Sequence, residues 1–463
     1  MKINSIFFKK IMALGLVLMA MSSCKKFVEA DLANNLIAKE DAFNTDNSAT
    51  SATLSLYSYY STLDHLRFST RLGGLLADEL QNTESNADLI QFSQNVVVPT
   101  NTVATNNVWG YAYQTIRYCN LILDGIGRST GMTTPVKNQL SGEAKFFRAL
   151  MYFNLVNFYG GVPITSEVTE LDNAFKPRAT VAEVYAQVFS DLKDAQNLLP
   201  ATYVGSSAAL KVRVNKWAAT ALLAKVYLYN KEYANAEAEA TKVIGSGTYS
   251  MATLSNAFIN TSSETILQLS TLFGASAFST YRTTSSAANV APPAYVLYNN
   301  FTKDFELNDN RKTSWVDSTT FNAVKYYRIN KYKVQTATAA TLGNEYTVLL
   351  RLGEQYLIRA EARAQQSNIG GAQDDINVIR TRAGLGNTTA ATQSALLTAI
   401  AKERKLELFG EYANRWFDLK RTGTADAVLG VLKPTWKTTA QLLPIGADQI
   451  LLNNKLTQNP GYN

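Results

Sequence analysis

Histidine is almost absent from this chain of 463 residues, because His65 is the only one. A Ser-His-Asp triad elsewhere in the chain, a three-histidine zinc site and a paired-histidine metalloprotease motif are therefore excluded or confined to one position. No cysteine or second histidine lies near His65 at metal-ligand spacing, so we interpret it as a surface residue in a loop-like stretch, 61–68. Neither a metal nor a cofactor is expected.

Cysteine is also scarce, with only Cys24 and Cys119. The N-terminal motif described below predicts that Cys24 is acylated, which leaves Cys119 without a partner for an intramolecular disulfide. Stability must therefore come from a hydrophobic core. The chain has no GxxxxGK loop and no GxGxxG motif between a strand and a helix, so nucleotide chemistry has no support. Charged residues make up 17% of the chain and form no basic block, so no nucleic-acid partner is expected.

The N-terminus has the features of a secretory signal peptide. Three lysines, at positions 2, 9 and 10, precede an apolar run of eleven residues, 11–21. This run is too short to span a bilayer as a stable helix. Residues 21–24 read Met-Ser-Ser-Cys and resemble the bacterial lipoprotein cleavage box, in which the cysteine, here Cys24, becomes the lipidated first residue. The alternative is an ordinary signal peptide with a chance cysteine. No second long apolar run follows, so the body is expected to be soluble and lipid-tethered.

The dominant sequence period is helical. Residues 216–244 have the spacing of a tetratricopeptide repeat, in which small residues let two antiparallel helices approach closely. A second unit begins near Leu350, and we interpret Gly370-Gly371 as the turn between its helices.

Two further helices have clear ends. Thr180 and Glu183 form a capping box before a helix with one apolar stripe, which Pro200 stops. Residues 143–159 are apolar almost all round and end at glycine, as a buried helix with a glycine cap does. The centre of the protein is therefore predicted to be an α-helical stack.

Residues 270–302 contain one charged residue, Arg282, among aromatic, hydroxyl and amide side chains. Aromatic rings stack on the C–H faces of sugars, and uncharged polar groups bind without the cost of desolvating a charge, so this composition favours a neutral polar ligand. The alternative is that the aromatic rings hold the loop on its own scaffold. The candidate ligand-binding residues are Tyr281, Tyr295, Tyr298, Phe273 and Trp109. Trp109 has a structural alternative, since its helical spacing also suits packing on the next helix.

Three carboxylates recur every four residues at Glu403, Glu407 and Glu411, so a helix would place them on one side. We interpret them as part of a structural arginine network rather than a glycosidase site. The candidate partners are Arg359, Arg363, Arg380, Arg382, Arg404 and Arg415. Asp78 and Glu79 are adjacent and point apart, which is poor geometry for two carboxyls that flank one glycosidic bond.

Several ordered passages carry a family resemblance. They are LGGLLADE at 72–79, EAKFFRA at 143–149, YGGVP at 159–163, ALLAKVYL at 221–228, the segments 351–362 and 403–421 with RWFDLKR, LPI at 443–445 and QNPGY at 458–462. Together they resemble the RagB/SusD family of outer-membrane lipoproteins.

The resemblance implies a mainly α-helical fold with four tetratricopeptide-like helix pairs and ligand-binding inserted loops. It implies a signal peptide at 1–23, a lipidated tether at 24–40, an N-terminal region at 41–270 and a C-terminal region with ligand-binding loops at 271–463. The implied partner is a SusC-like TonB-dependent outer-membrane β-barrel, over which the lipoprotein acts as a lid that captures oligosaccharide or, in some members, peptide. Lys25 and Lys26 depart from the acidic residues that commonly direct such lipoproteins to the cell surface.

Three functions from different classes follow. The first is a non-catalytic, outer-membrane-tethered binder that delivers glycan to a transporter, and we favour it because it explains the lipoprotein signal, the missing catalytic groups and the aromatic loop together. The second is a lipoprotein hydrolase, which needs a carboxylate pair at glycosidase spacing. The third is a tetratricopeptide scaffold that binds only protein on its helical surface.

Overall fold

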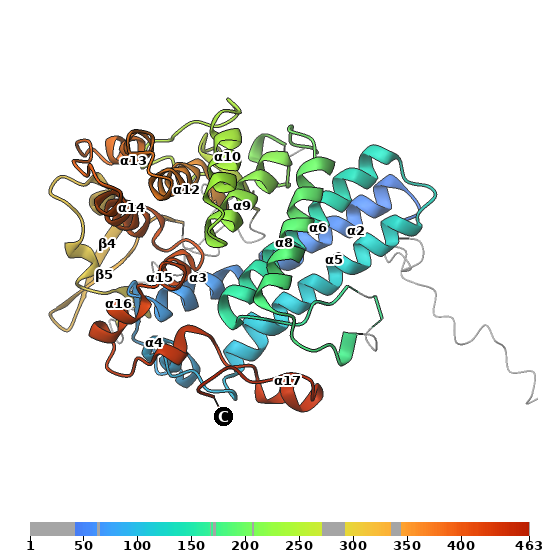
Figure 1. Cartoon of the computed structure of the whole chain (residues 1–463), viewed down its shortest axis with the longest axis horizontal. Coiled ribbons are helices and arrows are strands. Elements are labelled where there is room, and N and C mark those ends of the chain that lie inside the picture. The colour runs from blue at the N-terminus through green and yellow to red at the C-terminus, as the bar shows by residue number, and fades with distance from the viewer. Residues whose placement is uncertain are drawn as a thin grey trace, which may run out of the picture.

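The computed structural model describes residues 42–62, 65–166, 168–169, 173–205, 208–270, 292–334 and 344–462, with the backbone alone at 61–62 and 65–68. The fold is mainly α-helical (Figure 1). The α-helices are α2 (Asp46–Thr62), α3 (His65–Leu76), α4 (Ala87–Gln94), α5 (Tyr111–Arg128), α6 (Thr134–Tyr159), α8 (Val181–Leu198), α9 (Lys216–Tyr229), α10 (Tyr233–Ile244), α11 (Asn310–Trp315), α12 (Leu352–Gln365), α13 (Ile369–Arg382), α14 (Gln393–Leu408), α15 (Asn414–Arg421), α16 (Ala425–Leu432) and α17 (Ala447–Leu452). A π-helix, η2 (Val103–Gly110), leads directly into α5.

The helices from α5 to α14 stack largely in chain order (Figure 1). Helix α6 packs on α5 and α8, α9 lies between α8 and α10, and α12 contacts α10, α13 and α14. The predicted mainly α-helical, tetratricopeptide-like scaffold is therefore confirmed. Helix α6 lies at the centre of this scaffold. In the second half of α6 the side chains on nearly all sides are buried, so that half of the helix has no polar face.

The two predicted repeat units are α9 with α10 and α12 with α13. The turn of the second unit lies at 366–368, however, so the prediction that Gly370-Gly371 forms it is wrong. Asn368 caps α13 by accepting a hydrogen bond from the Gly371 N–H at 3.0 Å. A Cβ at Gly371 would lie 2.8 Å from the Asn368 side chain, so this glycine is required by the cap and not by a turn.

The capping box of α8 is present as predicted. The Glu183 N–H donates to Thr180 Oγ1 at 3.2 Å, and the Thr180 N–H donates to Glu183 Oε2 at 2.7 Å. Helix α6 ends, also as predicted, at Gly160, whose φ of 75° is a conformation that glycine adopts at little cost.

Replacing Thr180 with alanine is expected to lower the free energy of unfolding by about 1 kcal/mol, because the first turn of α8 loses a side-chain acceptor. The measurement is the urea midpoint. Thr180→Ser keeps the hydroxyl and should unfold like the wild type; an equal loss in both variants would assign the effect to the threonine methyl group instead.

Two small antiparallel sheets accompany the helices. The larger has the strand order β1 (Leu80–Asn82), β3 (Tyr295–Leu297), β5 (Val324–Ile329), β4 (Val316–Phe321). The smaller pairs β2 (Thr265–Leu269) with β6 (Thr347–Arg351). Strand β3 lies near the end of segment 270–302, which the sequence interpretation treated as a loop. Its Tyr-Val-Leu sequence pairs with β1 and β5, and all three residues are buried.

The stretch 61–68 is helical where it is described, so the prediction of a loop there is wrong. Helix α2 continues to Thr62 and α3 begins at His65. Leu72, Leu75 and Leu76 of α3 are buried, and this packing holds the helix although its first turn has no strong start signal. The His65 side chain lies outside the described residues.

Candidate functional site

Trp109 lies in η2 and is 5% exposed. Its ring packs edge-on against Tyr159, with ring centres 5.1 Å apart, and against Tyr113 at 4.8 Å. Trp109 therefore packs on a neighbouring helix, which is the structural alternative that its sequence spacing had left open. The side chain forms part of the contact between η2 and α6.

Tyr295 begins strand β3 and is also 5% exposed. Its hydroxyl donates to Glu84 Oε2 at 2.5 Å and accepts from Arg71 Nη1 at 3.0 Å. The Arg71 guanidinium lies 5.4 Å from the ring centre. The Tyr295 side chain thus anchors β3 to α3 and to the segment after β1.

Tyr298 follows β3 directly and is only half-buried. Its backbone N–H donates to the Glu79 carbonyl at 3.1 Å, which extends the β1–β3 pairing by one residue. Burial, and then the negative charge of Asp78, raise the pKa of Tyr298 to about 12, so its hydroxyl stays protonated at neutral pH. Tyr298 has the aromatic face and the neutral hydroxyl that the sequence interpretation requires.

The other candidates of the aromatic segment, Tyr281 and Phe273, lie outside the described residues, as does Cys24. Tyr295 begins β3 and Tyr298 follows its last residue, so the two lie at opposite ends of this strand, and only Tyr298 lies at the sheet end next to Glu79. The structure places Trp109 apart from them, on the face of α6.

Asp78 and Glu79 lie beside this sheet end and have opposite electrostatic environments. Burial disfavours the ionised form of Asp78, but Arg415 at 2.7 Å and Lys405 at 2.8 Å outweigh it and hold its pKa well below the usual range. Burial, and then Asp78, raise the pKa of Glu79 to about 8. Glu79 has the pKa of a general acid, but it is 3% exposed and lines none of the cavities described below. We therefore assign it no catalytic role.

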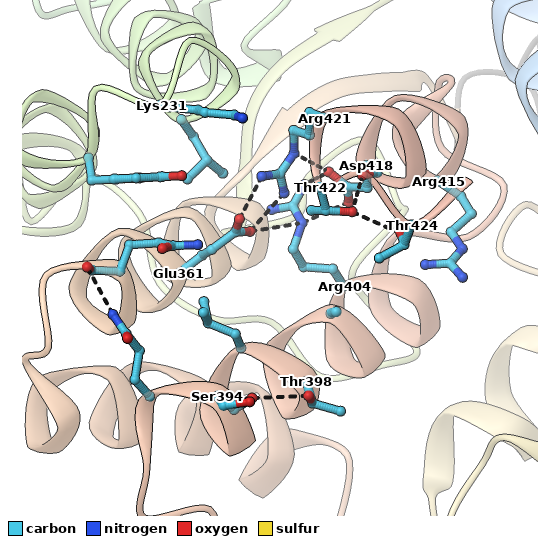
Figure 2. Close-up of a pocket in the computed structure, with 16 residues that line it drawn as sticks. Lys231, Glu361, Ser394, Thr398, Arg404, Arg415, Asp418, Arg421, Thr422 and Thr424 are labelled. Carbon is cyan, nitrogen blue, oxygen red and sulfur yellow. Dashed lines mark hydrogen bonds and ion pairs between the residues drawn. The ribbon is translucent and has the colours of Figure 1, made fainter. Parts of the chain in front are cut away.

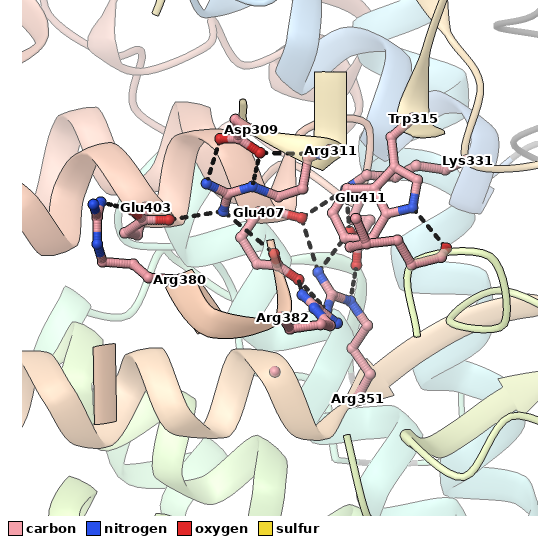
Figure 3. A network of polar contacts seen from close by, with 12 residues as sticks. Asp309, Arg311, Trp315, Lys331, Arg351, Arg380, Arg382, Glu403, Glu407 and Glu411 are labelled. Atoms are coloured by element: carbon pink, nitrogen blue, oxygen red, sulfur yellow. Dashed lines mark hydrogen bonds and ion pairs between the residues drawn. The ribbon is translucent and has the colours of Figure 1, made fainter. Parts of the chain in front are cut away.

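A buried network of arginines and glutamates joins α14 to β6, α11 and α13 (Figure 3). Glu407 is at its centre and is fully buried. Its carboxylate contacts Arg351 at 2.6 Å, Arg311 at 3.5 Å and Arg382. Burial opposes ionisation, but Arg382, Arg351 and Arg311 together hold the pKa of Glu407 well below its usual range.

The flanking glutamates are paired in the same way. Glu403 contacts Arg311 at 2.7 Å and Arg380 at 2.8 Å. Glu411 contacts Lys331 at 2.5 Å. The prediction that the three glutamates form a structural network is confirmed, with Arg380 and Arg382 as predicted partners.

The other four predicted arginines pair elsewhere, because aspartates or glutamates of neighbouring elements lie closer. Arg359 and Arg363 pair with Asp375, Arg404 with Asp418, and Arg415 with Asp78. The sequence interpretation missed Arg311, Lys331 and Arg351. A signal existed for Arg351, since a lone charge within the apolar run 348–352 indicates a buried ion pair.

A cavity of about 580 Å³ lies between α10, α12, α14 and α15 (Figure 2). Its wall is rich in uncharged polar groups, namely Tyr233, Gln365, Gln393, Ser394, Thr398, Thr422 and Thr424. Lys231 lies across the cavity from Ser394 and Thr398. None of the candidate ligand-binding residues from the sequence lines this cavity, because its wall is assembled from separate helices.

Four of the charged residues of this cavity, Glu361, Arg404, Asp418 and Arg421, are paired with one another. Arg421 contacts Glu361 at 2.5 Å and Asp418 at 2.7 Å, and Arg404 contacts Asp418 at 2.8 Å. Burial opposes the ionisation of Asp418, but Arg404 and Arg421 hold its pKa well below the usual range. An acid that is always ionised cannot protonate a leaving group at neutral pH. The arrangement suits binding rather than acid catalysis.

Among the residues that the structure describes, no group of three His, Cys, Asp or Glu side chains is placed to hold a metal ion. Over the same residues, no helix is long and apolar enough to cross a membrane.

Two family models together match most of the chain. The first, a SusD-like model described as starch-binding and associating with the outer membrane, matches residues 37–228. The second, the SusD family model, matches residues 277–462. The chain belongs to the SusD/RagB family. The resemblance seen in the sequence is therefore confirmed, and membership supports a glycan-binding accessory role at the outer membrane.

Two curated relatives are similar over three quarters or more of the chain. The SusD-like protein P38 of Formosa agariphila is 26% identical, with 98% of this chain and 99% of that protein covered. The SusD-like protein P2 of the same bacterium is 28% identical, with 76% and 80% covered.

Solved structures share the fold of this SusD/RagB member. A SusD-like protein of Bacteroides fragilis superposes with a TM-score of 0.79 at 23% identity, covering 91% of this chain and 98% of that one. A laminarin-binding SusD-like protein superposes with a TM-score of 0.73 at 24% identity, covering 90% and 99%.

Proposed function

We propose that this protein is a non-catalytic lipoprotein that captures oligosaccharide at the outer membrane and delivers it to a SusC-like TonB-dependent β-barrel. The observation that carries the proposal is SusD/RagB membership along most of the chain. The laminarin-binding relative with the same fold supports a glycan as ligand. Lipidation at Cys24 supplies the anchor, and the protein faces the cell surface.

The absence of catalysis is proposed from the state of the carboxylates. Asp78, Glu407 and Asp418 are buried against arginines that keep them ionised, and Glu79 is protonated but enclosed. A glycosidase needs one protonated and one ionised carboxyl group exposed on either side of the scissile bond. The described carboxylates named here offer no such pair.

We propose Tyr298, Tyr281 and Phe273 as the aromatic contacts of the ligand. Tyr295 and Trp109, with 5% exposure each, are buried in scaffold contacts and are not expected to stack on a sugar. Tyr298 is the candidate whose described surroundings allow a direct test.

Replacing Tyr298 with alanine is expected to weaken binding of laminari-oligosaccharides about tenfold, which corresponds to roughly 1.4 kcal/mol, because a stacking ring is lost. Isothermal titration measures the affinity. Tyr298→Phe keeps the ring and should bind nearly as well as the wild type. Equal affinity of the alanine variant and the wild type would remove Tyr298 from the ligand site.

The delivery role has a separate test. The protein is extracted from the native outer membrane in mild detergent, affinity-purified and analysed by mass spectrometry. A TonB-dependent barrel in stoichiometric amount is the expected result. Recovery of the protein alone, or with soluble partners only, would contradict the transporter role and favour the tetratricopeptide scaffold.

A further inference from the structure

A second cavity, of about 620 Å³, adjoins the one in Figure 2. It lies among the C-terminal ends of α6, α9 and α15, the first turn of α8 and residues 438–442. Lys231 and Arg421 line both cavities. These two cations therefore lie where the two cavities meet, with one cavity on each side of them.

Positive charge dominates the pair of cavities. The second cavity is lined by Lys231, Lys420 and Arg421, and none of the residues recorded along it is a carboxylate. The first adds Arg404 and Arg415 and contains two carboxylates. Five cations thus face two carboxylates, Glu361 and Asp418, across both spaces.

Two of these five cations, Lys231 and Lys420, have no carboxylate partner within the described part of the chain, whereas Arg404, Arg415 and Arg421 are paired. Lys231 is exposed and forms no recorded ion pair. Lys420 donates to the Asn157 carbonyl and lies 5.0 Å from the Trp416 ring centre, without a carboxylate. Burial lowers the pKa of Lys420 to about 7, so a nearby anion would stabilise its charged form.

One donor at the first cavity has no acceptor at all. Arg404 is 2% exposed, and its Nη1 atom is buried without a hydrogen-bond partner, although Nε and Nη2 both donate to Asp418. An unpaired buried guanidinium N–H costs free energy.

The remaining wall suits a sugar. Tyr233, which is half-buried at the first cavity, supplies an aromatic ring, whereas Tyr185 and Tyr229 at the second cavity are 8% and 5% exposed and belong to the core. Threonine hydroxyls and glutamine amides also line the walls, as at Thr398, Thr438 and other positions. An aromatic ring, neutral polar groups and cations together match a chain that carries both hydroxyl and anionic groups.

We propose that the joined cavities form a second binding site, for an acidic oligosaccharide whose carboxylate or sulfate groups contact Lys231, Arg421 and Lys420. The site lies on the helical repeats and shares no residue with the Tyr298 end of the larger sheet. It does not depend on the proposed delivery to a transporter.

The test titrates tetragalacturonate into the full chain in detergent by calorimetry. Lys231→Glu reverses an exposed charge at the junction and is expected to weaken binding at least tenfold. Lys312→Glu makes the same change at an exposed lysine of α11 outside both cavities and should leave the affinity unchanged, as should Tyr298→Ala. No binding by the wild type, or an equal loss in both lysine variants, would overturn the proposal.

Further ligands test which anionic group the site binds. A sulfated galactan oligosaccharide that binds at the same site more tightly than tetragalacturonate would assign the site to sulfate esters, and the reverse order to uronates. Neutral laminarihexaose should not displace either probe. Oligoglutamate bound as tightly as tetragalacturonate would overturn the sugar assignment in favour of an acidic peptide.

A second variant tests whether Lys231→Glu weakens binding by removing a contact or by disturbing the fold. Lys231 has a φ of 63° at the end of α9, where glycine is the preferred residue. Lys231→Gly removes the cation without straining the backbone, so the urea midpoint should not fall while tetragalacturonate affinity does. Retained affinity in this variant, with Lys231→Glu weakened, would contradict a direct contact by the Lys231 ammonium group.

Discussion

Replacing Arg351 with methionine is expected to lower the free energy of unfolding by roughly 3–5 kcal/mol, the range for breaking a buried ion pair. Arg351 is 1% exposed, and its guanidinium makes five hydrogen bonds, to Glu264, Glu407 and Glu411. The variant leaves three buried carboxylates with less compensation. The measurement is the urea midpoint at pH 7, followed by far-UV circular dichroism.

Two variants control this experiment. Arg351→Lys keeps the charge but cannot reproduce the planar fork, so an intermediate loss is expected. Arg128→Met breaks an exposed pair with Asp124, in which the arginine side chain is 66% exposed, and should cost at most about 0.5 kcal/mol. A similar small loss in Arg351→Met would contradict a stabilising role of the network.

The second large effect is a pH dependence at Glu79. Its pKa is about 8 in the folded protein, against an ordinary value of 4.5, so the folded state holds a proton that the unfolded state releases. The stabilising contribution is complete below about pH 4.5 and is lost as the pH rises to about 8. In that window the free energy of unfolding falls by about 1.4 kcal/mol for each pH unit.

Glu79→Gln should remove this dependence, because the amide has nearly the same volume and does not titrate. Relative to the wild type, the variant is expected to gain several kcal/mol between pH 5 and pH 7.5, measured by urea unfolding at both values. Asp78→Asn is the matched contrast. Asp78 does not titrate between the two pH values, but its charge contributes to the raised pKa of Glu79, so Asp78→Asn should reduce the pH dependence without abolishing it. A pH-independent effect of Glu79→Gln would show that Glu79 is ionised in the folded protein.

The helical scaffold could be predicted from the sequence because its signals are local. The capping box at Thr180, the glycine stop at Gly160 and the alanine spacing of 216–244 each act within a few residues. They fixed the type of each element, and the ordered passages from 72 to 462 indicated the family.

Local patterns also failed at identifiable places. Strand β3 was missed because three residues become a strand only through pairing with β1 and β5, which are distant in sequence. The same pairing buries Tyr295, which the composition of its segment alone had suggested as a ligand contact.

The sequence by itself determined the class of this protein: a stack of helix pairs of SusD/RagB type. Tertiary structure alone decided which charges are paired and where polar space remains. Arg351 contacts Glu264 and Glu411, which are 87 and 60 residues away in the sequence, and Lys231 and Arg421 line the same two cavities. Such contacts depend on how helices pack, and no sequence period encodes the distance between residues on different elements.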